Sequence, residues 1–212
     1  MRSRPSQRPY NVEYYRRNRD IELQRVRIRQ AGMVELLREL RRVPCADCGG
    51  VYKPYQMDFD HRDPASKSFN VMTGRAMLMS TAKVLAEVAK CEILCVNCHR
   101  VRSRHQHRLR LAMHTPGSSA RLVEKRELWR RQAALLDRLR DVPCADCGGT
   151  FPPCAMDFDH RRADLKASRV TAMIGRAGDA RILAEVAKCD IVCANCHRAR
   201  TYERRATRGK RE

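Results

Sequence analysis

The chain has 212 residues, and its 44 Lys and Arg against 24 Asp and Glu give a formal net charge of +20. This length allows one domain or two small ones, and an aromatic content of 5% excludes a large aromatic core. Such a basic balance favours a polyanionic partner. No apolar run reaches the roughly 18 residues of a membrane-spanning helix.

The N-terminal region is basic and leads into a predicted helix. Residues 1–20 are polar and rich in arginine, which predicts a flexible basic arm. From about Asp20 to Arg42 we predict a packing helix that ends before Pro44, with an apolar stripe formed by Val34, Leu36, Leu37 and Leu40. A second basic amphipathic helix is predicted before Pro143, with the matching stripe of Ala133, Leu135, Leu136 and Leu139.

Three segments after the first predicted helix occur twice in the chain. Val43–Gly50 returns as Val142–Gly149, Met57–Arg62 as Met156–Arg161, and Cys95–Arg100 as Cys193–Arg198. Each copy therefore holds a CxxC, an Asp-His pair and a second CxxC with a histidine directly after it. The repeat predicts two tandem modules, and what the copies share is mostly potential metal ligands.

Short strands and helices are predicted between these segments. Alternation from Met57 to His61 indicates a strand that places Phe59 on one face and Asp58 and Asp60 on the other. A helix is expected from about Thr81 to Lys90, and Thr81 and its counterpart Asp179 are good N-cap residues. The apolar pairs Ile93-Leu94 and Ile191-Val192 predict second strands, and a final Arg-rich helix is expected to open at His99 and His197.

The module boundaries follow from the repeat. The first module is predicted over residues 21–105 and the second over 121–204, with a basic tail over 205–212. A linker over 106–120 is indicated by its Pro-Gly-Ser-Ser stretch, which has no match in the other copy.

The cysteines admit two interpretations, disulfides or metal ligands. Eight of the 11 form four CxxC pairs, a spacing typical of zinc, and no signal peptide follows Met1. We therefore predict a cytoplasmic protein with two structural zinc ions, each held by four thiolates that leave no open position. One set is Cys45, Cys48, Cys95 and Cys98, and the other is Cys144, Cys147, Cys193 and Cys196.

This order of CxxC, Asp-His and CxxC-His resembles the zinc-containing branch of the HNH endonucleases, over about residues 43–105 and 142–204. The resemblance implies an α+β fold of two small zinc-stabilised ββα-metal modules, each a β-hairpin followed by a helix around one metal. It implies that His61 and His160 are general bases for the attacking water. It also implies a catalytic divalent metal such as Mg²⁺ or Mn²⁺ in each copy, held by Asp60 and His99 or by Asp159 and His197.

One position departs from the family. Its middle asparagine lies shortly before the second CxxC, where this chain has Lys90 and Lys188. Asparagine occurs instead inside the CxxC, at Asn97 and Asn195. Three alternatives stay open: these asparagines take the catalytic orienting role, the lysines take it, or the site is altered.

The chemistry of phosphodiester hydrolysis accounts for these residue types. It needs a base for water and a cation beside the phosphate. Arginines could hold flanking phosphates, namely Arg62, Arg100, Arg102, Arg161, Arg198 and Arg200.

We therefore expect a metal-dependent nuclease acting on double-stranded DNA, as a monomeric pseudo-dimer that cuts both strands. The first alternative is a non-catalytic zinc-stabilised nucleic-acid-binding protein, and the second is an assembly role. A pure binder has no need of the Asp-His pair in both copies.

Overall fold

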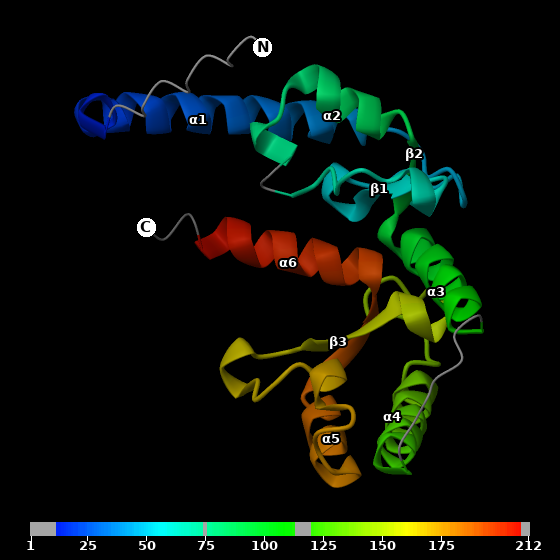
Figure 1. Ribbon diagram of the computed structural model, residues 1–212. Coiled ribbons are helices and arrows are strands. Elements are labelled where there is room, and N and C mark those ends of the chain that lie inside the picture. Colours follow the sequence, from blue (N-terminus) through cyan, green and yellow to red (C-terminus); the bar gives the residue numbers. More distant parts are fainter. Residues whose placement is uncertain (1–11, 74–75, 113–119, 209–212) are drawn as a thin grey trace. The chain divides into compact units, whose positions relative to one another are not determined.

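The computed structural model describes residues 12–73, 76–112 and 120–208, and it combines helices with two small two-stranded sheets (Figure 1). The helices are α1 (Val12–Leu40), α2 (Thr81–Val88), α3 (Val96–Ala112), α4 (Ala120–Leu139), α5 (Asp179–Val186) and α6 (Ala194–Arg208). The strands are β1 (Met57–His61), β2 (Cys91–Cys95), β3 (Met156–His160) and β4 (Cys189–Cys193), paired as β1–β2 and β3–β4. The predicted α+β class is confirmed.

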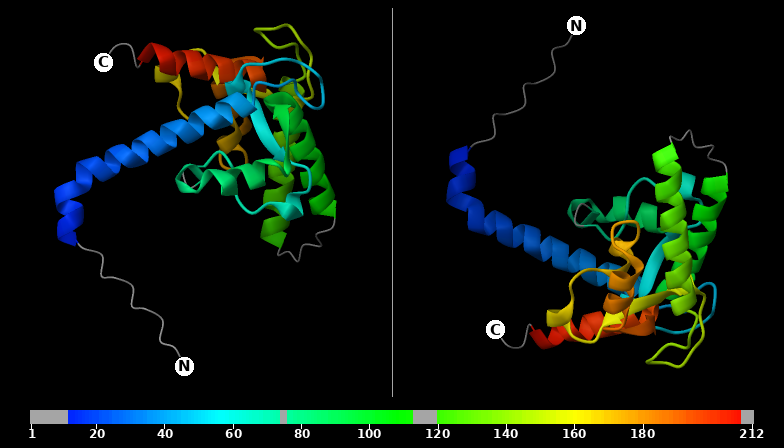
Figure 2. Two further views of the ribbon diagram at one scale, coloured as in Figure 1. Left: turned by 90° about the horizontal axis from the view of Figure 1, so that it is seen from above. Right: turned by 90° about the horizontal axis from the view of Figure 1, so that it is seen from below.

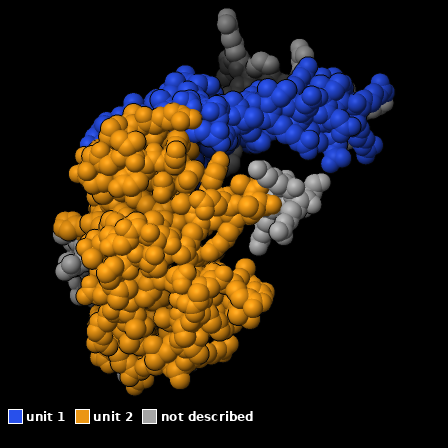
Figure 3. All heavy atoms as spheres, turned by 180° about the vertical axis from the view of Figure 1, so that it is seen from behind, with its two compact units in different colours: residues 1–40, 61–92 blue, residues 41–60, 93–212 orange. Residues whose placement is uncertain are grey.

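The chain divides into two compact units, which Figure 3 colours separately. Unit 1 contains Met1–Leu40 and His61–Glu92, and unit 2 contains Arg41–Asp60 and Ile93–Glu212. Unit 2 thus holds the whole second copy and the cysteine segments of the first copy. Independent folding of the two modules over 21–105 and 121–204 stays a prediction.

Unit 1 is built on the long helix α1, drawn in blue in Figure 2. Met33 and Leu37, one turn apart, are buried, and α1 contacts the short 3-10 turn Ala76–Leu78. Leu37 of the predicted stripe is in the core, whereas Val34 is 43% exposed. The buried face is rotated from the predicted one because Met33, which was not counted in the stripe, lies four residues before Leu37.

Unit 2 contains the complete β-hairpin of the second copy. β3 and β4 pair antiparallel, from Met156 opposite Cys193 to His160 opposite Cys189. Two small apolar clusters flank the hairpin: one contains Leu136, Val170, Met173, Ile182 and Cys189, and the other contains Cys144, Met156, Val192 and Cys193. This division into small clusters agrees with the low aromatic content.

Most predicted elements are present with shifted ends. β1 and β3 have the predicted bounds, and α2 begins at Thr81 but ends at Val88. The N-cap prediction is wrong by one residue, since Thr81 and Asp179 already lie inside their helices and the caps are Ser80 and Gly178. α3 and α6 begin inside the second CxxC, so His99 and His197 lie in the first helical turn.

Helices extend into the segments predicted as arm, linker and tail. Residues 12–20 belong to α1, residues 106–112 to α3 and residues 205–208 to α6. The remainders of these segments, 1–11, 113–119 and 209–212, lie outside the described residues. Among the described helices, none is both long enough and apolar enough to cross a membrane.

Candidate metal centres and catalytic residues

The two predicted zinc-ligand sets come together in the structure. In each set the four Sγ atoms lie within 4.8 Å of one another. One cysteine pair lies in the turn after the leading helix, and the other spans the junction of β2 with α3 or of β4 with α6. Gly49 and Gly148, with φ of 67° and 68°, lie in the first turn, where the Gly49 N–H donates to the Cys45 carbonyl at 2.9 Å.

The environment of the sulfurs suits a metal ion. The N–H of Cys95 donates to Cys45 Sγ at 3.2 Å, and that of Cys193 donates to Cys144 Sγ at 3.1 Å. Burial raises the pKa of Cys45 and Cys144, but backbone N–H bonds outweigh burial and bring each pKa to about 7. Four sulfurs at this spacing could hold a tetrahedral ion such as zinc. None of the 11 cysteines, all of which lie in the described ranges, forms a disulfide, which argues against the disulfide alternative.

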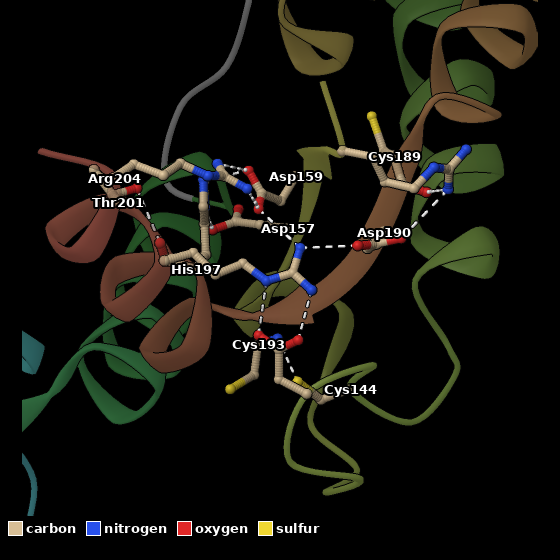
Figure 4. Close-up of polar contacts among 12 residues, drawn as sticks. Cys144, Asp157, Asp159, Cys189, Asp190, Cys193, His197, Thr201 and Arg204 are labelled. Carbon is tan, nitrogen blue, oxygen red and sulfur yellow. Dashed lines mark hydrogen bonds and ion pairs between the residues drawn. The ribbon is translucent and has the colours of Figure 1, made fainter. Parts of the chain in front are cut away.

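A histidine lies between two aspartates beside the second cysteine set. Asp157 and Asp159 share one face of β3 because side chains alternate along a strand. Asp157 Oδ2 is 2.7 Å from Nδ1 of His197, and Asp159 Oδ1 is 3.5 Å from its Nε2 (Figure 4). The predicted metal ligands Asp159 and His197 are therefore close together.

The first copy repeats this geometry within unit 2. His99 Nδ1 is 3.0 Å from Asp58 Oδ2, and its Nε2 is 3.5 Å from Asp60 Oδ1. Burial raises the pKa of Asp58, but bonds from His99 and Arg198 outweigh burial and hold this pKa at about 2. Asp58 is thus an ionised acceptor for the histidine N–H.

Asp58 and Asp157 were not selected as site residues from the sequence. The signal was present, because alternation along the predicted strand places Asp58 on the face of Asp60. Both aspartates also occur in the repeated Met-Asp-Phe-Asp-His segment.

The predicted general base of the second copy lies in another environment. Alternation directs His160 to the face of β3 opposite Asp159, and it is 8% exposed. Its Nε2 is 2.8 Å from Glu185 Oε1. The same carboxylate accepts the N–H of Ala167 at 2.8 Å and a bond from Lys188 Nζ at 2.7 Å. The bond from Lys188 lowers the pKa of Glu185 to about 2, although burial raises it.

Unit 1 contains the same arrangement around His61. Its Nε2 is 2.9 Å from Glu87 Oε1, and Lys90 Nζ is 2.7 Å from Glu87 Oε2. In both copies, a lysine is thus connected to the histidine through a glutamate.

Asn97 and Asn195 connect the two copies. The N–H of Asn97 donates to Asn195 Oδ1 at 3.3 Å, and the N–H of Asn195 donates to Asn97 Oδ1 at 3.0 Å. Both residues are buried, and the exchange is reciprocal, as in an isologous dimer interface. A catalytic orienting role for them stays a prediction.

All six arginines predicted to bind phosphate make bonds within the chain. Arg100 bonds Asp157 at 2.7 Å and Arg198 bonds Asp58 at 2.6 Å, again reciprocally between the copies. The others donate within their own copy: Arg102 to Asp47, Arg200 to Asp146, Arg62 to the carbonyl of Cys91 and Arg161 to that of Cys189. Their contact with phosphate stays a prediction.

No family model matches the chain, and neither does any curated protein or solved structure. The resemblance to HNH endonucleases therefore rests on the residues described above.

Proposed function

We propose that the chain is a zinc-stabilised, metal-dependent nuclease that hydrolyses phosphodiester bonds of DNA. The observation that carries the proposal is the line of Asp, His and Asp that recurs in both copies with a 3.5 Å gap between the histidine Nε2 and the second aspartate. A formal charge of +20 supports a polyanionic substrate.

The Asp–His–Asp line has the donor arrangement of a divalent cation site. Asp58 and Asp157 accept the Nδ1–H of the histidine, which turns the Nε2 lone pair toward Asp60 or Asp159. Two neighbouring ligands about 2.1 Å from one octahedral ion, at an angle of about 90°, would lie about 3.0 Å apart, so the 3.5 Å gap would close by about 0.5 Å on binding. A divalent cation held there would neutralise charge on the phosphate and on the leaving oxygen.

His61 and His160 are the proposed bases. A glutamate at Nε2 fixes the tautomer, so that Nδ1 carries the lone pair that takes a proton from water. The ionised glutamate also stabilises the imidazolium formed by that transfer. Glu87 and Glu185 are thus proposed as positioning residues.

Plasmid cleavage tests the proposal. The zinc-loaded full chain, dialysed free of other metals, is mixed with supercoiled plasmid and Mg²⁺ or Mn²⁺. Cleavage should require the added ion and should be lost when Asp60→Asn and Asp159→Asn are combined. Combining His61→Gln with His160→Gln should slow cleavage by about 10²–10⁴-fold.

Each variant should keep two zinc ions by elemental analysis and should still bind DNA. Asp164→Asn, at an exposed aspartate, is the matched control and should cut like the parent. Equal cleavage by the double-histidine variant would reject the proposed bases.

A second function is favoured by the burial of the two histidine–glutamate pairs, His61 with Glu87 and His160 with Glu185. Glu185 joins β3, the loop at Ala167 and helix α5, so the group also has a purely structural use. A non-catalytic zinc-stabilised nucleic-acid-binding protein would need that structure as well. DNA binding that weakens with salt, without cleavage under any divalent ion, would favour this function over the nuclease.

A further inference from the structure

The two Asp–His–Asp lines differ in the hydrogen bonds that their second aspartate, Asp60 or Asp159, accepts. In the second copy, Arg204 Nη1 is 2.9 Å from Asp159 Oδ1 and Arg204 Nη2 is 2.7 Å from Asp159 Oδ2. Arg200 Nη1 lies 3.0 Å from the same Oδ2. Figure 4 shows Arg204 reaching from α6 over Asp159, beside His197. Both oxygens of this carboxylate are therefore bonded by guanidinium groups.

The equivalent aspartate of the first copy has no such bonds. Asp60 is 9% exposed, and within the described residues its buried Oδ2 has no hydrogen-bond partner. Arg102 Nη1 forms an ion pair with this oxygen at 3.5 Å, a separation too long for a hydrogen bond of normal length. A buried carboxylate oxygen without a donor is unfavourable, so this position calls for a cation or a further donor.

One sequence difference accounts for the two bonds from Arg204 that the first copy lacks. Arg204 lies 11 residues after Cys193, and the residue 11 after Cys95 is Gln106. Arg102 and Arg200 match each other, so the first of the two guanidinium groups is common to both copies. Gln106 is neutral and supplies no charge to Asp60.

We propose that the two candidate cation sites are not equivalent: Asp60 and His99 take a divalent cation, whereas Arg204 occupies the corresponding place beside Asp159. This inference rests on the proposed function, and it reduces the number of catalytic divalent cations from two per chain to one. A chain with one loaded site nicks one strand of a duplex, in contrast to the paired cuts expected from the repeat.

Exchanging the two residues tests the inference by counting bound ions. Mn²⁺ is titrated into the full chain holding its two zinc ions, and unbound Mn²⁺ is measured by electron paramagnetic resonance. The parent should bind one Mn²⁺, Arg204→Gln should bind two, and Gln106→Arg should bind none. Asp60→Asn should also bind none. Arg205→Gln, which alters the exposed neighbour of Arg204, should bind one.

Zinc content and circular dichroism verify that each variant is folded. Two Mn²⁺ or none in the parent would overturn the inference, as would a single Mn²⁺ in Arg204→Gln. One Mn²⁺ at Asp60 without DNA cleavage would reject the nuclease and leave the inference standing. Cleavage by a parent that holds two Mn²⁺ would support the nuclease and reject the non-equivalence of the two cation sites.

Discussion

The carboxylate of Glu185 bonds four groups at once. It is bonded by His160, by Lys188 and by the N–H groups of Ala167 and Ser168, and the residue is 3% exposed. Two of these donors belong to the backbone of a loop, and the imidazole belongs to β3. The glutamate thus positions the proposed base and holds the loop beside α5.

Replacing Glu185 with alanine should loosen that loop. A buried donor that loses its acceptor costs about 1–3 kcal/mol, so the variant should be destabilised by at least about 2 kcal/mol. Amide exchange at Ala167 and Ser168 should accelerate, which deuterium-exchange mass spectrometry can measure. Glu203→Ala, at an exposed residue of α6, is the control and should change stability by less than about 0.5 kcal/mol. Unchanged exchange in Glu185→Ala would contradict the role of the carboxylate.

Repetition in the sequence identified site residues but not their partners. Asp159 and His197 could be selected because both copies retain the Asp-His pair and the histidine directly after the second CxxC, and the structure places the two side chains 3.5 Å apart. Glu185 could not be paired with His160, since the contact depends on how α5 packs on the hairpin. A signal existed in the segment Ala-Glu-Val-Ala-Lys-Cys, which both copies contain. Arg204 has no counterpart, so repetition gave no reason to select it.

At the scale of elements, the turn of the first CxxC depends on glycine. Gly49 has a φ of 67°, in the left-handed region that costs other residues about 1–2 kcal/mol. No heavy atom lies within 4 Å of a Cβ built there, so the cost of a substitution is conformational and not steric. The turn sets the spacing of Cys45 and Cys48 for the metal.

Gly49→Ala should therefore weaken metal retention by the first cysteine set. We expect the free energy of zinc binding to weaken by about 1–2 kcal/mol. The weakening should appear as faster release of zinc to a colorimetric chelator. Gly32→Ala is a control for which we expect the opposite sign, because Gly32 lies inside α1 and no heavy atom lies within 4 Å of a Cβ built there. Alanine there should stabilise the helix by about 1 kcal/mol. Equal zinc release from Gly49→Ala and the parent would reject the requirement for glycine.

Strands were easier to predict than helix ends in this chain. The alternation of Met57–His61 marks a strand with both ends correct. α1 begins at Val12, inside the predicted arm, where the side chain of Asn18 donates to the Tyr14 carbonyl at 2.9 Å and the segment is polar, without an apolar stripe. Hydrophobic periodicity does not detect such a helix.

At the scale of the whole molecule, the copies are joined inside unit 2 by reciprocal bonds. Asn97 and Asn195 exchange backbone bonds, and Arg100 and Arg198 cross to the aspartates of the opposite copy. Tyr55 also stacks on Tyr202 at 4.2 Å between ring centroids. The monomeric pseudo-dimer that cuts both strands stays a prediction.

Asn97→Ala tests this interface. The substitution removes the acceptor of the buried Asn195 N–H, which should cost about 1–3 kcal/mol in urea unfolding of the zinc-loaded chain. Exchange of the Asn195 amide should accelerate as well. Asn18→Ala, at a half-buried residue of α1, loses only a local bond to the Tyr14 carbonyl and should leave stability within about 0.5 kcal/mol. Identical effects of the two substitutions would contradict the interface.

The reciprocal interface has an evolutionary consequence. A homodimer encoded by one gene must carry the same residue at both equivalent positions, so any change at one site appears at the other. Joining two copies in one chain removes that obligation while the shared asparagine contacts keep the halves together. Gln106 and Arg204 are a difference of the kind that no homodimer could hold. Duplication with fusion would thus have allowed the two halves to diverge. In the second half the guanidinium of Arg204 bonds Asp159, whereas in the first half Asp60 would stay available to a divalent ion from solution.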